Sequence, residues 1–221
     1  LEAQDIANSG WDYVSASGNI TLSFWFRCSA NQTFYAYLRS RDGTSQAYTF
    51  SFTASGNNTW TKITHTIPGN SNLTFDNNND TGLSLYWTPF YGTDYTNNKT
   101  LNTWAAYDQN NQTPDMASTW LTSGAATWDI TGIQLEVGPV ATPFEHRSFD
   151  DELRRCRRYF FKTSRWMGGA RGSSTYRAFT LDFGMRLTGS DVSSGTYTND
   201  GTAAGDVVYI GSSATRQVSN V

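Results

Sequence analysis

Charge is scarce in this chain, and basic charge is the scarcer kind. Charged side chains make up only 16% of the 221 residues, and the formal net charge is -3. Nucleic-acid-binding domains usually carry a basic face, whereas basic residues cluster here only at 154–158. The composition therefore argues against nucleic acid as a partner. No apolar run approaches the roughly 20 residues that a membrane-spanning helix needs, which argues against membrane insertion.

Cysteine is almost as sparse. The chain has two cysteines, Cys28 and Cys156, which lie far apart in the sequence. Two cysteines do not make a disulfide framework, and they show no metal-ligand spacing, so we expect two buried thiols.

The sequence starts at Leu1 without an initiator methionine or a signal peptide. We therefore expect an excerpt or a processed form of something longer.

Aromatic residues are plentiful at 15%, and Asn, Thr, Ser and Gly are frequent, a composition that favours strands and turns over helices. Apolar residues alternate with polar ones in several runs, which is the pattern of a half-buried strand. Strands are predicted at 20–28, 33–40, 46–52, 60–67, 83–89 and 128–137. In the first run the inward positions are Ile20, Leu22, Phe24, Phe26 and Cys28.

Strands at this spacing, joined by polar loops, predict an all-β fold, an antiparallel β-sandwich of the jelly-roll kind spanning residues 1–146. The inward set of the last strand changes phase near Gly132, as a β-bulge would make it do. The segment 92–119 is long, polar and rich in aromatic residues. Loops of that length in a compact domain are usually functional or mobile.

A short connector follows at 147–162. Ser148 with three acidic residues after it predicts a capped helix whose apolar stripe is Phe149, Leu153, Cys156 and Phe160. The chain then turns extended over 159–162. Residues 163–221 are expected to form a second, smaller β-rich module, with strands at 177–187 and 207–210. These strands are too few to close a stable sheet, so we expect missing residues or other chains to complete it.

The string Ile130-Thr-Gly-Ile-Gln-Leu-Glu-Val-Gly138, followed by Ala141-Thr-Pro-Phe-Glu-His-Arg147, resembles tail-fibre and related virion proteins of tailed bacteriophages, especially marine ones. Leu22-Ser-Phe-Trp-Phe26 and Ile67-Pro-Gly69 fit the same family. The likeness covers most of residues 1–162. It implies a carbohydrate-binding-module-like jelly roll in a virion protein, that is, a tail fibre or similar appendage. Phage fibres are commonly homotrimers, so the resemblance also implies a trimer.

Exposed aromatic rings in such a fold suggest sugar binding, because a ring can stack on the apolar face of a pyranose while amides and hydroxyls bond its hydroxyl groups. The candidate carbohydrate-binding residues are Trp87, Tyr91, Tyr95, Trp104 and Tyr107. The alternative is that Trp87 belongs to the core and the other rings fasten the long loop.

Calcium is a weaker possibility. The run Asp76–Asp80 offers oxygen ligands but lacks the pattern of an EF-hand, and a solvated Asn-rich loop is the simpler interpretation. The resemblance points instead to Glu2 or Asp5 together with Glu136 as ligands of a structural calcium. We expect no catalytic metal and no other cofactor.

Enzymatic activity is not expected. Glycoside hydrolysis needs two carboxylates facing each other across a cleft. The carboxylates closest in sequence are Glu136, Glu145 and the three acids at 150–152, which helix capping explains. Neither His65 nor His146 lies near a nucleophile motif, and His65 is expected to be a satisfied core histidine. The arginines at 154, 155, 157 and 158 are interpreted as a solvated helix face or as partners of a neighbouring chain.

The sequence thus predicts a non-enzymatic virion protein, a tail fibre or similar appendage, that recognises a host-surface glycan. Two alternatives remain open. One is a head-decorating or fibre-connecting protein that binds other virion subunits. The other is a sugar-binding module of a secreted glycosidase.

Overall fold

The computed structural model describes residues 1–157 and, beyond them, residues 170–171, 176–178, 195–196, 207–208 and 218–219. The chain divides into two compact units, Leu1–Glu145 and His146–Val221. Each unit is described by itself below. The three-part division at 146 and 162 stays a prediction, because residues 158–169 lie outside the described part of the chain.

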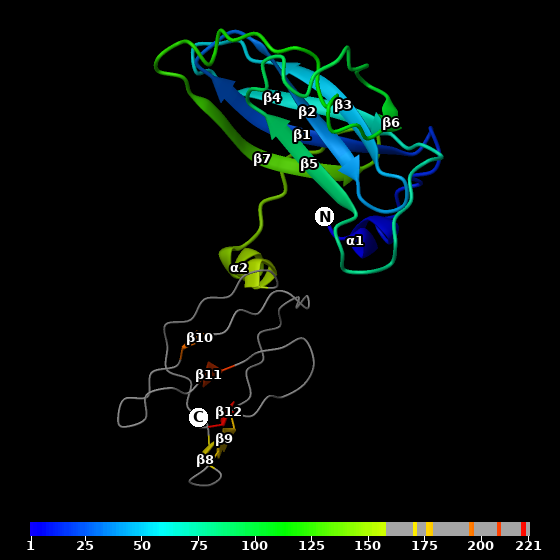
Figure 1. Ribbon diagram of the computed structural model, residues 1–221, viewed down its shortest axis with the longest axis vertical. Coiled ribbons are helices and arrows are strands. Elements are labelled where there is room, and N and C mark those ends of the chain that lie inside the picture. The colour runs from blue at the N-terminus through cyan, green and yellow to red at the C-terminus, as the bar shows by residue number, and fades with distance from the viewer. Residues whose placement is uncertain (158–169, 172–175, 179–194, 197–206, 209–217, 220–221) are drawn as a thin grey trace. The chain divides into compact units, whose positions relative to one another are not determined.

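The first unit is an antiparallel β-sandwich (Figure 1), which confirms the predicted all-β class. One sheet has the order β4-β1-β7 and the other β5-β2-β3-β6, with every neighbouring pair antiparallel. The assignment to the jelly rolls stays a prediction. The strands are β1 (Asn19–Cys28), β2 (Thr33–Ser40), β3 (Gln46–Thr53), β4 (Thr61–Pro68), β5 (Leu83–Thr88), β6 (Trp104–Ala106) and β7 (Trp128–Val137).

The core follows from the alternation of the sequence. On β1 the five predicted inward residues are all at most 3% exposed. Their rings meet those of the opposite sheet edge to face: Phe24 lies 5.3 Å from Phe52, and Phe26 lies 5.5 Å from Phe34. Aromatic pairs of this geometry add stabilisation beyond the apolar area that they bury. The two sheets are therefore held together by a layer of phenylalanines.

The predicted bulge in β7 is confirmed. Ser23 of β1 pairs with Gln134 and Trp25 pairs with Thr131, so two residues of β7 lie opposite Phe24 alone. Gly132 sits in this bulge with a φ of 59°, a conformation that side chains with a Cβ rarely adopt. The extra residue moves the inward set of β7 from even to odd positions.

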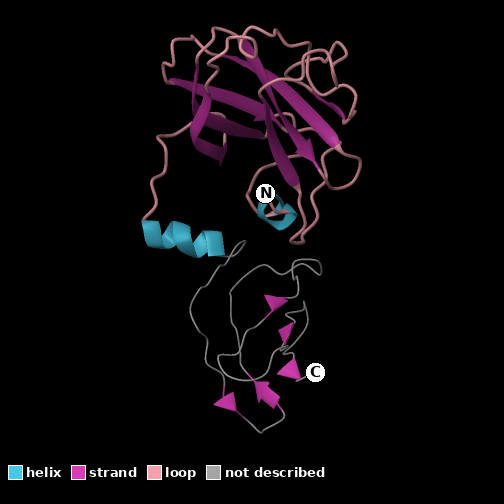
Figure 2. Ribbon diagram, turned by 60° about the vertical axis from the view of Figure 1, so that its left-hand side comes forward, coloured by secondary structure: helices cyan, strands magenta, loops and turns pink. Residues whose placement is uncertain are grey.

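Two elements of the first unit were not foreseen. A helix, α1 (Ala3–Ala7), lies at the start of the chain, and β6 lies within the segment predicted to be a loop. Both are too short to show a period in the sequence. Figure 2 shows that long loops join the strands of this unit. The Asn-rich run is tied to α1, because Asn8 donates to the Asn77 side chain at 3.0 Å and Gln4 N–H donates to Asn78 O at 2.8 Å.

Cys28 is buried, as predicted, but Cys156 is exposed, so the expectation of two buried thiols is wrong for the second.

His65 is a core residue stacked on Phe50 at 4.3 Å. However, its buried Nε2 has no hydrogen-bond partner. The expectation that His65 would be a satisfied core histidine is therefore wrong. Burial without a partner for the charged form lowers the pKa of His65.

In the second unit the predicted helix is present as α2 (Phe149–Arg157). The Ser148 hydroxyl accepts a hydrogen bond from Asp151 N–H at 3.3 Å, which is the geometry of an N-cap. Asp151 is paired with Arg154 and Arg155 of its own helix. Phe149 is 78% exposed, so the stripe does not form a core among the described residues. Five short strands follow, β8 (Ala170–Arg171), β9 (Tyr176–Ala178), β10 (Gly195–Thr196), β11 (Val207–Val208) and β12 (Val218–Ser219). Most of the predicted strand at 177–187 lies outside the described residues.

Candidate functional site

Trp87 is a half-buried ring that packs against the core. It shares the inward face of β5 with Leu83 and Leu85, and its ring packs edge to face on Phe24 at 5.7 Å. Its Nε1 is buried without a partner. This half-buried position against the core fits the alternative assignment of Trp87, and sugar binding by Trp87 stays a prediction.

Trp104 is also largely buried, with 8% of its surface exposed. Its Nε1 donates to Pro68 O at 2.7 Å, which fastens β6 to the end of β4, and its ring lies 5.5 Å from that of Tyr48. The residue anchors one edge of the sandwich. An 8% exposed ring leaves little surface for stacking on a sugar.

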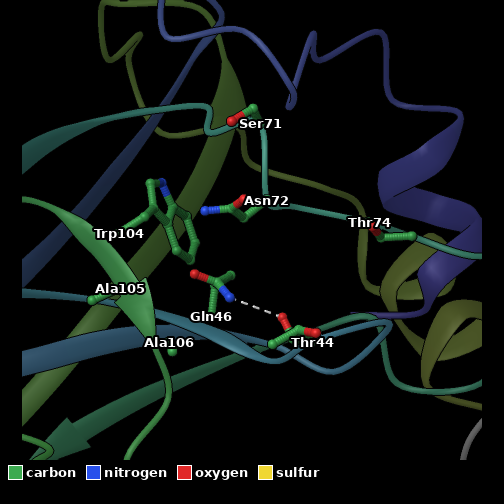
Figure 3. Close-up of a pocket in the computed structure, with 8 residues that line it drawn as sticks. All are labelled: Thr44, Gln46, Ser71, Asn72, Thr74, Trp104, Ala105 and Ala106. Atoms are coloured by element: carbon green, nitrogen blue, oxygen red, sulfur yellow. Dashed lines mark hydrogen bonds between the residues drawn. The ribbon is translucent and has the colours of Figure 1, made fainter.

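An edge of Trp104 nevertheless borders a pocket of about 460 Å³ (Figure 3). Gln46 is 4% exposed; its Nε2 donates to Thr44 O at 3.0 Å, and its Oε1 is turned toward Trp104. The Asn72 carboxamide approaches from the opposite wall. The pocket is lined by Thr44, Gln46, Ser71, Asn72, Thr74, Trp104, Ala105 and Ala106. Because no charged residue lines it, it suits a small neutral polar group.

The remaining predicted rings belong to a different place, the outer face of the sheet β5-β2-β3-β6. On β2, Tyr37 and Arg39 alternate with the buried Ala36 and Leu38 and so point away from the core. We call this cluster the tyrosine–arginine face. It comprises Tyr37, Arg39, Arg41, Tyr86, Tyr91, Tyr107 and Gln112.

Tyr37 is the centre of the tyrosine–arginine face. Strand pairing sets it opposite Tyr86, and the two rings stack with centroids 4.6 Å apart and an interplanar angle of 14°. The Tyr37 hydroxyl donates to Gln112 Oε1 at 2.6 Å, and the Tyr91 hydroxyl donates to the same oxygen at 3.3 Å. Burial raises the pKa of Tyr37 far above its usual value, so the residue stays a neutral phenol.

The segment 92–119 is held down on this face. Gln112 O accepts a hydrogen bond from Thr49 Oγ1 at 2.9 Å, and Asn102 N–H donates to Thr49 O at 2.8 Å. Thr49 is on the outward side of β3, so the loop lies over part of the sheet. Gln112 therefore joins the loop both to Thr49 and to the tyrosine hydroxyls.

Both arginines of the face are fixed in place. The Arg39 guanidinium lies 3.5 Å from the centroid of the Tyr107 ring, and its Nε donates to Ser45 Oγ at 3.0 Å. Arg41 donates from Nε to Ser84 Oγ at 3.2 Å and from Nη2 to the Tyr86 hydroxyl. A cation over an aromatic ring is attracted by the negative face of that ring. The guanidinium groups are thus oriented before any ligand arrives.

Tyr95 lies at the border of the face. It is 54% exposed, and its ring meets the Tyr91 ring edge to face at 5.5 Å. Its φ of 54° places the backbone in the left-handed region, as in a tight loop. Of the five predicted site residues, the structure brings Tyr91, Tyr95 and Tyr107 to one side of the sandwich. Trp87 and Trp104 lie on its inner side.

The described residues contain no group of three or more His, Cys, Asp or Glu side chains that could hold a metal ion. Glu136, proposed as a calcium ligand, instead accepts hydrogen bonds from Thr142 N–H, at 3.1 Å, and from the Thr142 hydroxyl. These bonds and one with Gln134 lower the pKa of Glu136. A role for Glu2 or Asp5 in calcium binding stays a prediction.

The sequence pointed to the long loop but missed the strand residues beneath it: Tyr37, Arg39, Arg41 and Tyr86. A signal was present, because Tyr37 and Arg39 occupy the outward positions of an alternating run. Tyr86 likewise alternates with Leu85 and Trp87. What the sequence did not show is that β2 and β5 are neighbours, which is what stacks Tyr37 on Tyr86.

Among the described residues, no helix has the length and apolar character to cross a bilayer. Comparison of the chain with models of protein families, with curated proteins and with solved structures gives no match in any of the three. The case for a function therefore rests on the fold, on the tyrosine–arginine face and on the motifs of the sequence.

Proposed function

We propose that residues 1–145 are a carbohydrate-binding unit of a tailed-bacteriophage fibre or similar virion appendage, and that the tyrosine–arginine face binds a glycan on the host surface. One observation carries the proposal: tyrosine rings, guanidinium groups and a carboxamide gather on one outer face of a rigid sheet. Rings supply apolar surface with a polar handle, and guanidinium and carboxamide groups supply directional hydrogen bonds. Sugars present both kinds of surface.

Preorganisation supports the same proposal. Arg39, Arg41 and Gln112 are each held by a hydrogen bond to a neighbouring strand or loop residue. Side chains that are already ordered lose little conformational entropy when a ligand binds. A flexible surface with the same composition would bind more weakly. The assignment to a phage virion rests on the resemblance carried by residues 130–147, and a trimeric assembly is part of the same proposal.

The test is binding of the full chain to a glycan array and to surface polysaccharide from candidate host bacteria. Tyr107→Ala removes the ring under Arg39, and we expect it to abolish or strongly weaken glycan binding while the melting temperature changes little. Trp60→Ala is the matched control, because Trp60 is an exposed ring next to an arginine on the opposite sheet. Equal binding by both variants, or no glycan binding by the parent chain, would contradict the proposal.

A structural role in the virion is the second candidate, and one observation favours it. An apolar groove of about 590 Å³ lies between the edge strands β5 and β7. Its lining includes Leu83, Leu85, Leu135 and Ile133, of which Ile133 is 45% exposed. Open apolar edges of this kind are commonly covered by another subunit. Host adsorption that persists after deletion of residues 1–145 from the virion protein would favour this role over receptor binding.

A further inference from the structure

Among the residues that the structure describes, the two arginines of the tyrosine–arginine face have no acidic partner. Neither Arg39 nor Arg41 forms an ion pair, although the described residues include four other such pairs. Their hydrogen bonds go to the hydroxyls of Ser45, Ser84 and Tyr86. A guanidinium has five N–H donors, so several donors of each arginine remain unused by the protein.

This arrangement stands out against the charge of the unit. Residues 1–145 contain twelve Asp and Glu against five Lys and Arg, so acidic partners are abundant. Asp42 follows Arg41 and Asp108 follows Tyr107 in the sequence, but neither bonds to the two arginines; each accepts a backbone hydrogen bond instead. Asp42 accepts a hydrogen bond from Asp76 N–H at 3.1 Å, and Asp108 accepts one from Asn110 N–H at 2.9 Å. Asp108 also acts on Lys99, whose pKa is lowered by burial and partly restored by that acid.

A guanidinium fork matches the geometry of an oxyanion and binds it with two parallel hydrogen bonds. Arg39 and Arg41 are kept in place by rings and hydroxyls that do not neutralise their charge. Tyr37 is only 3% exposed, but Tyr86, Tyr91 and Tyr107 are partly exposed and can contact a sugar ring. We infer that the ligand of the tyrosine–arginine face is an anionic glycan, one whose sugars carry carboxylate or sulfate groups. The inference rests on the proposed glycan-binding function and specifies the substrate class.

A glycan fits better than a nucleic acid. A polyphosphate would be repelled by the excess of acidic residues in the unit, whereas a glycan with spaced acidic groups can place single charges at the two arginines. No Lys or Arg side chain lines the groove between β5 and β7 or the pocket beside Trp104, so neither offers an equivalent pair of guanidinium groups.

The first experiment uses three polymers with one backbone: dextran, carboxymethyl dextran and dextran sulfate. We expect the full chain to bind at least one charged polymer and to bind dextran at least ~10-fold more weakly. Binding should weaken as the salt concentration rises from about 0.05 to about 0.5 M, because salt screens exposed charges. Single-stranded oligothymidylate is the polyanion control. Binding of oligothymidylate as tight as that of the charged dextrans would overturn the glycan class.

The variants Arg39→Gln and Arg41→Gln remove the charge and keep a polar side chain of similar reach. We expect their combination to weaken binding of the charged polymer at least ~10-fold. Arg27→Gln is the control, because Arg27 is already paired with Asp129 at 2.9 Å, and it should bind like the parent. Unchanged binding by the double variant, with its melting temperature preserved, would overturn the inference.

Failure of this inference can be told apart from failure of the proposed function on the glycan array. Binding to neutral glycans that depends on Tyr107 but not on Arg39 and Arg41 would leave the function standing and overturn the anionic class. Binding to no glycan, charged or neutral, would overturn both. Preference for acidic members of the array, lost in the double arginine variant, would support both.

Discussion

Both outer faces of the sandwich carry an arginine beside an aromatic ring, but the two arginines differ in whether an acidic side chain pairs with them. On the sheet β4-β1-β7, the Arg27 guanidinium lies 4.8 Å from the Trp60 ring, and its Nε is paired with Asp129 at 2.9 Å. On the sheet β5-β2-β3-β6, Arg39 lies 3.5 Å from Tyr107 and has no acidic partner. An arginine beside an aromatic ring is therefore not by itself a sign of a site. The second face differs from the first because, among the described residues, no acidic side chain neutralises its guanidinium groups.

The first face is also covered by its own chain. Thr21 Oγ1 donates to Gly138 O at 2.7 Å, and Thr66 Oγ1 donates to Pro139 O at 3.1 Å. Further along, Gln134 Oε1 accepts from Glu145 N–H at 2.8 Å. The segment after β7 thus folds back and uses the polar groups of its own sheet. On the tyrosine–arginine face the loop uses Thr49 and Tyr37 but leaves the arginines to other partners.

The largest difference between the faces should appear on removal of one ring from each. Tyr86→Ala deletes the partner of Tyr37 and of Arg41, and we expect glycan affinity to fall by about 10-fold or more, about 1.4 kcal/mol. Trp60→Ala, on the other face, should leave affinity within about twofold. Titration calorimetry with the charged dextrans measures both. A larger loss of affinity in Trp60→Ala than in Tyr86→Ala would mean that the site lies on the sheet β4-β1-β7 instead.

Backbone strain offers the next test, on the covered face. Gly132 adopts a φ of 59°, and a Cβ there would lie 3.1 Å from Trp25 Cδ1. Gly132→Ala should lower the free energy of unfolding by about 1–2 kcal/mol. Gly124→Ala is the control, because its φ is 73° but its Cβ would meet nothing within 4 Å. Denaturant unfolding compares them. Equal losses in the two variants would show that the contact with Trp25 contributes nothing to stability. Glycan binding should be unchanged in both variants.

Acidification should lower the stability of the core that both faces share, because His65 is buried there. Burial lowers the pKa of His65, so the unfolded chain takes up a proton before the folded one does. The free energy of unfolding should therefore fall as the pH drops below about 6.5, until the pH reaches the folded pKa. His65→Phe keeps a ring on Phe50 and should flatten this fall between pH 7.5 and pH 5.5, roughly the range in which histidine titrates. An identical fall in both proteins would contradict the role of His65.

The smallest effect is expected for Arg27→Gln. Its ion pair with Asp129 joins side chains that are 39% and 43% exposed, and such pairs contribute at most about 1 kcal/mol. Thermal unfolding measures the change. A loss of several kcal/mol would mean that the covered face depends on this pair far more than its exposure indicates.

The strands were predictable because each is long enough to show alternation. β7 was predicted at 128–137, and the structure has Trp128–Val137, including its bulge. β6 and α1 were missed because three and five residues carry no measurable period. The inward position of Trp87 could be predicted, since it shares an alternating face with Leu83 and Leu85. The burial of Trp104 was not, because its environment is made by Pro68 and Tyr48, which are distant in sequence.

The candidate site was predictable only in part for the same reason. Tyr91, Tyr95 and Tyr107 could be proposed from the length and composition of their loop. The face to which they belong depends on the order of strands, which places Tyr37 beside Tyr86 and carries the loop over Thr49. Strand order is set by long-range packing, and alternation within one strand does not report it. Absence of an acidic partner is likewise visible only in three dimensions.

The bulge in β7 has a consequence for how this protein could change by mutation. Trp128 and Ile130 point inward before the bulge, and Leu135 points inward after it only because one residue is inserted between them. Loss of a single codon at position 132 would restore a regular strand and turn Leu135 and Ile133 to opposite sides from those they occupy now. The half of the strand beside Phe26 would keep its packing, while the apolar groove along β5 would lose two of its lining side chains. One codon thus decides which side chains line the groove between β5 and β7, and its loss would leave the residues of the tyrosine–arginine face in place.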